Sequence, residues 1–276
     1  MSTVRRLCAP DPCELVALLA LPPTAPSLPV TRLVAVLGAR LASASRTSPT
    51  RLDAFVAEFG AARFTTAFRW SARGARRPLG TGALRRLVAG TSRDLLGAAH
   101  EEVDDLCDRA QRGLARRGAL GTWLAAAPAE ARALCAIEAA SWAWGLCHLL
   151  DLDANADRVA VGVPDAWFDV PGARTTLHGR RDATGTTAAS GLLRLRDGAP
   201  GARALDGLLV DGLAAGIAGG TPTVPARVVG AWPDAGVALV VELDATAVRH
   251  AARLVVACAA VPGAGPGRRT EAVLAA

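Results

Sequence analysis

The chain has 276 residues, enough for one large domain or two small ones with a buried core. A hydrophobic fraction of 51% excludes a disordered chain, and the six cysteines lack the CxxC spacing of zinc sites. The net charge of +6 is uneven, because residues 1–100 carry fourteen arginines against five acids and residues 101–276 carry seventeen against twenty.

The N-terminal segment predicts short helices between proline-rich stretches. Six prolines between residues 8 and 30 leave room for only one short helix. Val30 to Ser43 has the apolar spacing of a helix, and Ser48-Pro49 predicts the start of another that carries Leu52 and Phe55 on one face. The apolar run from Leu15 to Leu21 is too short to cross a bilayer, so we expect a cytoplasmic protein with reduced thiols and no membrane partner.

The middle of the chain predicts two longer helices. Gly74 to Gly82 is a basic loop, and the apolar spacing after it predicts a helix over Thr91 to Arg117 with Ser92 as its cap. Pro128 opens a second helix, Ala129 to Leu150, which ends in an acidic turn.

The second half changes to short strand-like runs. These runs, punctuated by glycine and proline, are Val159–Val161, Ala166–Val170, Thr175–Gly179, Leu192–Arg196, Arg227–Trp232 and Val237–Leu243. Helical spacing returns over Leu205–Ile217 and Thr246–Ala260. We therefore predict an α/β fold in which a helical N-terminal half precedes a mixed β-sheet core, a three-strand meander included, with flanking helices.

Arginines gather in the first half of the chain. The stretch from Arg63 to Arg93 contains no acid. Its eight arginines are Arg63, Arg69, Arg73, Arg76, Arg77, Arg85, Arg86 and Arg93. Such a stretch suits a polyanion such as DNA, and the alternative interpretation is a solvated, arginine-rich surface.

Five motifs follow one another in an order that has a known parallel. They are Ser48-Pro-Thr-Arg-Leu-Asp-Ala-Phe55, Leu96-Gly-Ala-Ala-His100-Glu-Glu-Val, Leu177-His-Gly179-Arg-Arg-Asp182, Leu192-Leu-Arg-Leu-Arg-Asp-Gly198 and Asp206-Gly-Leu-Leu-Val-Asp211. This order resembles the RecB-like branch of the PD-(D/E)XK nuclease superfamily. In that branch a histidine helix precedes a Gly-x-x-Asp step, an Asp-x-Lys strand and a Gln-x-x-x-Tyr helix.

The resemblance implies a restriction-endonuclease-like domain over residues 48–261. A helical, proline-rich extension (residues 1–47) would precede it, and a flexible tail (residues 262–276) would follow. It also implies a divalent metal, Mg²⁺ or Mn²⁺, that activates water to attack a phosphodiester bond. Asp182 and an acid on the next strand would hold that metal.

Matched residue by residue, the implied catalytic site is incomplete. His100 and Asp182 match the family pattern, but Arg194 stands where the second acid belongs and Arg196 where the lysine belongs. The chain contains no lysine at all. An arginine beside Asp182 would itself occupy the carboxylate and displace a metal. A shifted register could instead bring Asp197 to the metal, although one residue of offset reverses the side-chain direction.

The glutamine and tyrosine of the last helix are also replaced, by Gly207 and Asp211. Outside the resemblance, His100 reads as a half-buried histidine and Asp182 as a turn acid paired with an arginine. Some RecB-like nucleases carry an iron–sulphur cluster on cysteines near the C-terminus, but only Cys258 lies there, so we expect no such cofactor.

These residues predict a nucleic-acid-binding protein, with DNA as the expected partner, a catalytically inactive nuclease-like core and no cofactor. The first alternative is a metal-dependent deoxyribonuclease that uses Asp182, His100 and Asp197 as rearranged ligands. The second is a non-catalytic scaffold subunit in DNA repair, which docks a helicase or nuclease partner.

Overall fold

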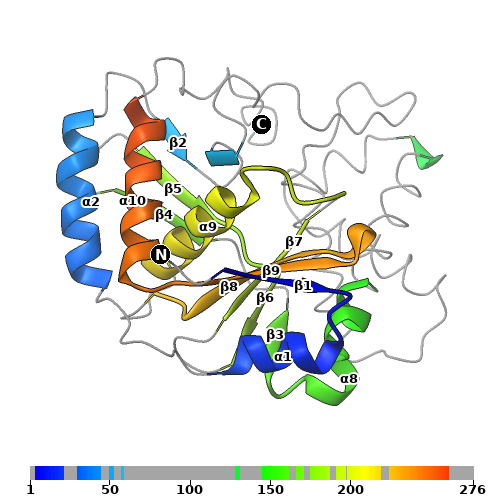
Figure 1. The fold of residues 1–276 in the computed structure, drawn as a ribbon. Helices are drawn as coiled ribbons and strands as arrows, with labels where there is room; N and C mark the ends of the chain where they lie inside the picture. Colours follow the sequence, from blue (N-terminus) through cyan, green and yellow to red (C-terminus); the bar gives the residue numbers. More distant parts are fainter. Residues whose placement is uncertain are drawn as a thin grey trace. The chain divides into compact units, whose positions relative to one another are not determined.

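The computed structural model describes residues 4–21, 30–44, 50–52, 57–58, 128–130, 145–161, 166–170, 175–186, 191–196, 198–218 and 224–260 (Figure 1). The chain divides into two units. The first comprises Met1–Thr65 and Asp157–Gly267, and the second comprises Thr66–Ala156 and Arg268–Ala276. In the described part of the chain, no helix is long and apolar enough to span a membrane.

The first unit contains a mixed sheet in the order β1-β9-β8-β7-β6-β3. Its strands are β1 (Val4–Cys8), β3 (Val159–Val161), β6 (Ala183–Gly185), β7 (Leu192–Leu195), β8 (Arg227–Trp232) and β9 (Val237–Glu242). Only the β7–β8 pair is parallel among these described strands. The chain crosses from β7 to β8 through a helix, as parallel neighbours require.

A second sheet of the same unit has the order β2-β5-β4. It consists of β2 (Thr50–Leu52), β4 (Ala166–Asp169) and β5 (Thr175–Gly179), with β2 parallel and β4 antiparallel to β5. Among the described residues of this unit, the α-helices are α1 (Pro12–Ala20), α2 (Val30–Ala44), α9 (Ala204–Ala218) and α10 (Ala245–Ala260), and a short 3-10 helix, η2 (Pro233–Ala235), joins β8 to β9.

Helices α1 and α9 cover opposite faces of the six-stranded sheet. Arg227 of β8 donates from its guanidinium to the Leu18 carbonyl at the end of α1, at 2.7 Å. Gly230 lies three residues further along β8, and a Cβ added there would meet the Leu208 side chain of α9. Residues at odd and even positions of a strand point to opposite faces. Arg227 therefore closes the free carbonyls of α1 on one face, while α9 packs on the other.

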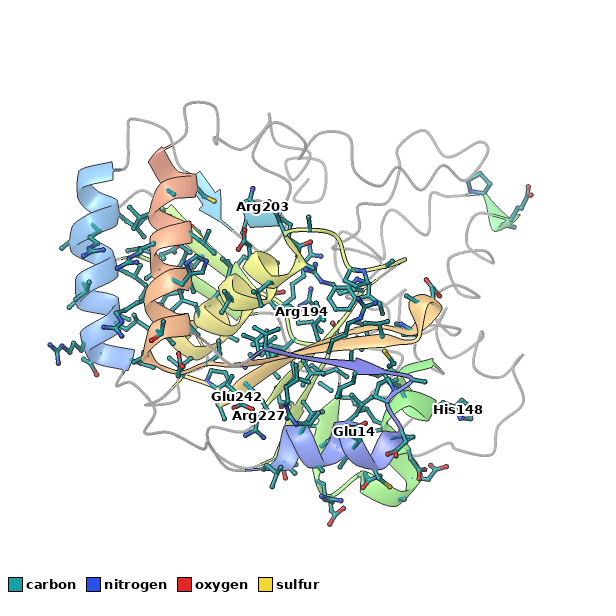
Figure 2. All side chains as sticks on the ribbon, in the orientation of Figure 1. Glu14, His148, Arg194, Arg203, Arg227 and Glu242 are labelled. Atoms are coloured by element: carbon teal, nitrogen blue, oxygen red, sulfur yellow. The ribbon has the colours of Figure 1, made fainter. Side chains whose placement is uncertain are left out.

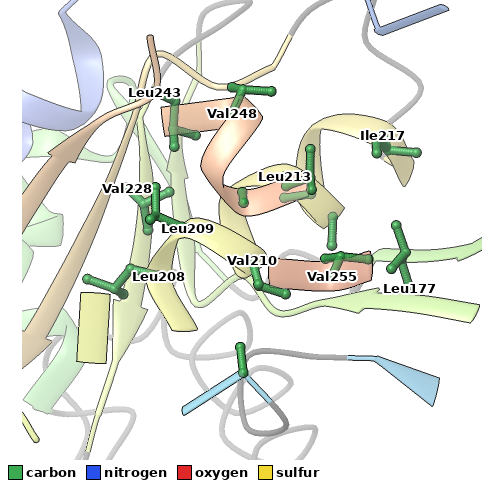
Figure 3. Close-up of a cluster of buried hydrophobic side chains, with 14 of the residues drawn as sticks. Leu177, Leu208, Leu209, Val210, Leu213, Ile217, Val228, Leu243, Val248 and Val255 are labelled. Atoms are coloured by element: carbon green, nitrogen blue, oxygen red, sulfur yellow. The ribbon is translucent and has the colours of Figure 1, made fainter. Parts of the chain in front are cut away.

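Helix α9 is the centre of the hydrophobic core. Nearly all of its residues are buried, because it contacts β8 and β9 in one sheet and β4 and β5 in the other. Leu208, Leu209 and Leu213 contribute to the cluster in Figure 3, together with side chains of β8 and α10. A helix that is apolar on all sides is typical of this fully enclosed position.

The α/β class predicted from the sequence is confirmed, with a mixed sheet and flanking helices. The bounds of β8 match the predicted Arg227–Trp232, and α9 and α10 begin within one residue of the expected positions. Most of the helical N-terminal half, including the basic loop and the helix expected at Thr91–Arg117, lies outside the described residues.

Two local expectations were wrong, and one strand was not predicted. Thr50–Leu52 is a strand rather than the first turn of a helix, because it pairs in parallel with β5. Val4–Cys8, for which the sequence predicts no element, forms β1. The expected three-strand meander is divided, since β4 and β5 belong to one sheet while β7 pairs with the short strand β6 in the other.

Strand β5 and helix α9 pack so closely at Gly179 that this position has no room for a larger residue. A Cβ added there would lie 2.8 Å from the backbone nitrogen of Ala215 and 2.9 Å from the Cβ of Ala214. Gly179→Ala should therefore lower the free energy of unfolding by about 1–3 kcal/mol, measured by urea denaturation. Gly201→Ala is the matched control, because its added Cβ meets nothing within 4 Å and should change stability by less than about 0.5 kcal/mol. Equal effects of the two changes would contradict this packing.

The second unit is described at residues 128–130 and 145–156. A helix begins at Ala129, as predicted, and the helical stretch from Gly145 ends at Leu150. The short helix α8 (Leu152–Asn155) follows, and the buried Asn155 amide donates to the carbonyls of Leu150 (3.2 Å) and Asp151 (3.0 Å). This amide closes the end of the helix with bonds that the backbone does not supply.

Half-buried Cys147 in this unit should react slowly with alkylating agents. Burial, and next the nearby Asp153 carboxylate, raise the pKa of its thiol from 9.0 to about 11. Only the thiolate attacks, and the raised pKa leaves a smaller thiolate fraction at Cys147 at pH 8.5. The greater nucleophilicity of a thiolate of high pKa offsets part of this loss. We therefore expect Cys147 to react about tenfold more slowly than exposed Cys13 at this pH. Its rate should keep rising until the pH passes 11. Iodoacetamide labelling followed by peptide mass spectrometry measures each cysteine separately, and equal rates at pH 8.5 would contradict the assignment.

Candidate functional site

The site begins with two arginines that the pleat of β7 places on one face. Arg194 and Arg196 are two residues apart, so both point toward the face that α9 covers. Arg194 pairs in register with Gly230 of β8 and is 1% exposed, which makes it one of the largest fully buried side chains described. A buried guanidinium is stable only with acceptors around it.

Two carboxylates supply those acceptors. The Nε atom of Arg194 donates to Oδ2 of Asp211 at 2.6 Å, and one terminal nitrogen donates to Oδ2 of Asp182 at 2.5 Å. Asp211 is completely buried and the side chain of Asp182 is 14% exposed. Figure 2 shows Arg194 in the interior, between α9 and the strands. We call Asp182, Arg194 and Asp211 the buried triad.

Backbone groups complete the coordination of both carboxylates. Oδ2 of Asp182 also accepts from the Leu195 N–H at 2.7 Å, and the Asp182 N–H donates to the Leu193 carbonyl at 3.0 Å. Oδ1 of Asp211 accepts from the N–H of Arg180, directly after β5, at 3.1 Å. Through Asp211, α9 is therefore bonded to residues of both sheets, and the buried triad lies at the junction between them.

Arg196 belongs to a second ion pair on the same face. Its guanidinium pairs with Glu58, whose side chain is 8% exposed, and it lies over the Trp232 ring at 6.0 Å from the ring centroid. Glu58 approaches α9 at Gly207, where an added Cβ would overlap the carboxylate. The absence of a side chain at Gly207 therefore makes room for the acid that neutralises Arg196.

The described residues of this site do not fit a divalent metal. Mg²⁺ and Mn²⁺ prefer several carboxylate oxygens arranged around one point. Here the guanidinium of Arg194 takes one oxygen from each of Asp182 and Asp211, and it brings a fixed positive charge to the place between them. Within the described residues, no group of three or more histidine, cysteine, aspartate or glutamate side chains could hold a metal ion.

Of the residues predicted from the sequence, Asp182 and Arg194 are brought together and Arg196 lies beside them. The sequence predicts that an arginine pairs with the Asp182 carboxylate, and Arg194 forms this ion pair. His100, Asp197 and the eight arginines between residues 63 and 93 lie outside the described residues. The proposed roles of these residues stay predictions.

Sequence reasoning missed two acids. The family pattern places Asp211 at the position of a replaced tyrosine, yet it is the second carboxylate of the buried triad. A lone acid in the middle of an apolar helix was the available signal, because such a group needs a buried cation. Glu58 had a weaker signal, an acid between Ala57 and Phe59 in an apolar run, and its pairing with Arg196 depends on the tertiary fold.

Neither a family model, nor a curated protein, nor a solved structure matches this chain. The resemblance to RecB-like nucleases therefore stays a prediction from the motifs.

Proposed function

We propose that the protein binds nucleic acid and has a nuclease-like core that is catalytically inactive. The observation that carries this proposal is the position of Arg194, whose guanidinium bridges Asp182 and Asp211. In the resemblance, this arginine replaces an acid that would hold the metal. Here Arg194 bonds Asp211 of α9, which also accepts from the N–H of Arg180 directly after β5, so these residues hold α9 against both sheets.

The charge at the site favours inactivity. Arginine keeps its proton at any pH a protein tolerates, so the positive charge of Arg194 cannot be removed by titration. A metal would have to displace the buried guanidinium of Arg194 from both carboxylates. It would then lie beside a positive charge that had lost these two partners. Breaking such a buried pair costs about 3–5 kcal/mol, which metal binding would have to offset.

The nucleic-acid half of the proposal rests on the sequence. Eight arginines without an acid between residues 63 and 93 suit a chain of phosphates, which arginine binds through two parallel hydrogen bonds. Contacts of this kind carry no base information. We therefore propose binding that is largely indifferent to sequence and that weakens with salt.

A cleavage assay tests the inactive core. Purified protein with Mg²⁺ or Mn²⁺ and labelled single- or double-stranded DNA should give no more product than the Asp182→Ala variant. Circular dichroism of that variant establishes that it is folded. Metal-dependent cleavage by the wild type that Asp182→Ala abolishes would favour the metal-dependent deoxyribonuclease instead.

A further inference from the structure

Strand β1 forms one end of the six-stranded sheet, and among the described strands β9 is its only neighbour. Four of its five residues are exposed, and Leu7 is half-buried. Val4, 44% exposed, is one of three large hydrophobic side chains exposed in the described part of the chain. After Cys8 the chain leaves the edge through Ala9, whose φ of 45° ends the strand. Within the described part of the chain, β1 is thus a short edge with no strand on its outer side.

The hydrogen bonds of β9 fix which backbone groups of β1 point outward. Ala9 donates to the Gly236 carbonyl in the β1–β9 register, so bonded pairs recur at alternate residues, Leu7 and Arg5. The bonds between β9 and β8 agree with this assignment. The Leu243 N–H donates to the Ala226 carbonyl, so β9 bonds β8 through the residues that do not bond β1. The N–H and C=O groups of Val4, Arg6 and Cys8 consequently point away from the sheet.

The side chains at this edge are basic on both faces. Arg6 pairs in register with Leu239, whereas Arg5 pairs with Val240, so the two arginines point to opposite faces of the sheet. Both are exposed, and β1 contains no acid. A strand added here would have a positive charge diagonally or directly opposite on each face.

We propose that the outer edge of β1 binds an extended, acidic segment of another protein by strand addition. Three outward residues offer three N–H donors and three carbonyl acceptors, the main-chain groups that strand addition uses. Acidic side chains at alternate positions lie on one face of the added strand, so they would meet Arg5 or Arg6 according to the register. The β-branched residues between them suit the other face of an exposed edge.

A second copy of the chain fits this edge less well. The one antiparallel register that uses all three outward residues of both strands places Val4 opposite Cys8 and Arg6 opposite its own copy. Like charges directly opposite in a strand pair are destabilising. An acidic partner removes this repulsion and replaces it with attraction.

Proline at residue 6 tests the backbone contact selectively. Arg6→Pro removes the charge and an outward N–H, whereas Arg6→Thr removes the charge alone, so the two variants form a matched pair. The β1–β9 bonds should survive Arg6→Pro, with a melting temperature equal to that of Arg6→Thr. Leu7→Pro removes an inward N–H and should lower that temperature.

The binding probe is a fluorescein-labelled short peptide of alternating glutamate and valine, with a lysine–valine peptide as the charge control. Fluorescence anisotropy should show saturable binding to the wild type and none of the lysine–valine peptide. Arg6→Pro should weaken binding about fivefold relative to Arg6→Thr, since one hydrogen bond is lost. Arg5→Glu combined with Arg6→Glu should abolish it. A copy of the glutamate–valine peptide with methylated backbone nitrogens should not bind.

Three results would overturn the proposal. The first is no saturable binding of the glutamate–valine peptide. The second is equal affinity for Arg6→Pro and Arg6→Thr, which would show attraction by charge without strand pairing. The third is a concentration-dependent dimer in sedimentation that Arg6→Pro dissociates, which would assign the edge to a second copy.

Discussion

Arg194→Met should lower the free energy of unfolding by about 3–5 kcal/mol, the cost of leaving buried charges without their partner. The change removes the guanidinium that bonds Asp182 and Asp211 and leaves two carboxylates facing each other at the junction of the two sheets. Methionine is similar in length and apolar, so lost volume contributes little. Urea denaturation followed by circular dichroism measures the effect.

Arg203→Met is the matched control for this change. Arg203 also bonds an aspartate of α9, Asp206, at 2.9 Å, but its side chain is 52% exposed. An exposed ion pair contributes between zero and about 1 kcal/mol, so the control should stay within that range. The comparison separates the loss of a buried partner from the loss of an arginine.

Neutralising the two acids should restore much of the stability lost at Arg194. In the triple variant Arg194→Met, Asp182→Asn and Asp211→Asn, no charge remains in the buried triad, and each amide oxygen can still accept the backbone N–H that its carboxylate held. We expect it to be more stable than Arg194→Met alone. A loss below about 1 kcal/mol in Arg194→Met, or no recovery in the triple variant, would show that the buried triad does not hold the sheets together.

The core of the fold was predictable because its signals are local. After Arg227, β8 continues as the apolar run Val228–Trp232, which Pro233 ends. Helix α10 follows Asp244, which caps it by accepting from the N–H groups of Thr246 and Ala247. β1 and β2 were not predictable, because β1 pairs with a strand from the opposite end of the chain and β2 with one in the second half. Their sequences, Val-Arg-Arg-Leu-Cys and Thr-Arg-Leu, have no strand pattern of their own.

The candidate site was half predictable for a related reason. The spacing of Arg194 and Arg196 indicated a shared face of one strand, and the structure brings Arg194 to Asp182. The partners Asp211 and Glu58 come from separate helical segments, so their positions depend on how α9 packs between two sheets. The apolar pattern of a helix predicts that an acid inside it is buried, and a buried acid needs a cation. The pattern does not identify that cation.

DNA binding should lose about half of its salt dependence when four of the eight clustered arginines are replaced. With all eight in contact with phosphates of a duplex, the slope of log affinity against log salt would be about −7. Affinity would then fall roughly 10⁴-fold between 50 and 200 mM salt. Glutamine at Arg69, Arg73, Arg76 and Arg77 should reduce the slope to about −4, as measured by fluorescence anisotropy with labelled duplexes.

A control with the same net charge distinguishes a localised site from general attraction. Its four substitutions, also to glutamine, are at the exposed residues Arg32, Arg40, Arg249 and Arg253 of α2 and α10. This control should keep a slope near −7, because it leaves the clustered arginines intact. Equal losses in both variants would mean that charge is felt diffusely over the surface. Absence of DNA retention by the wild type at physiological salt, with stable co-purification of a helicase or nuclease, would instead favour the scaffold subunit.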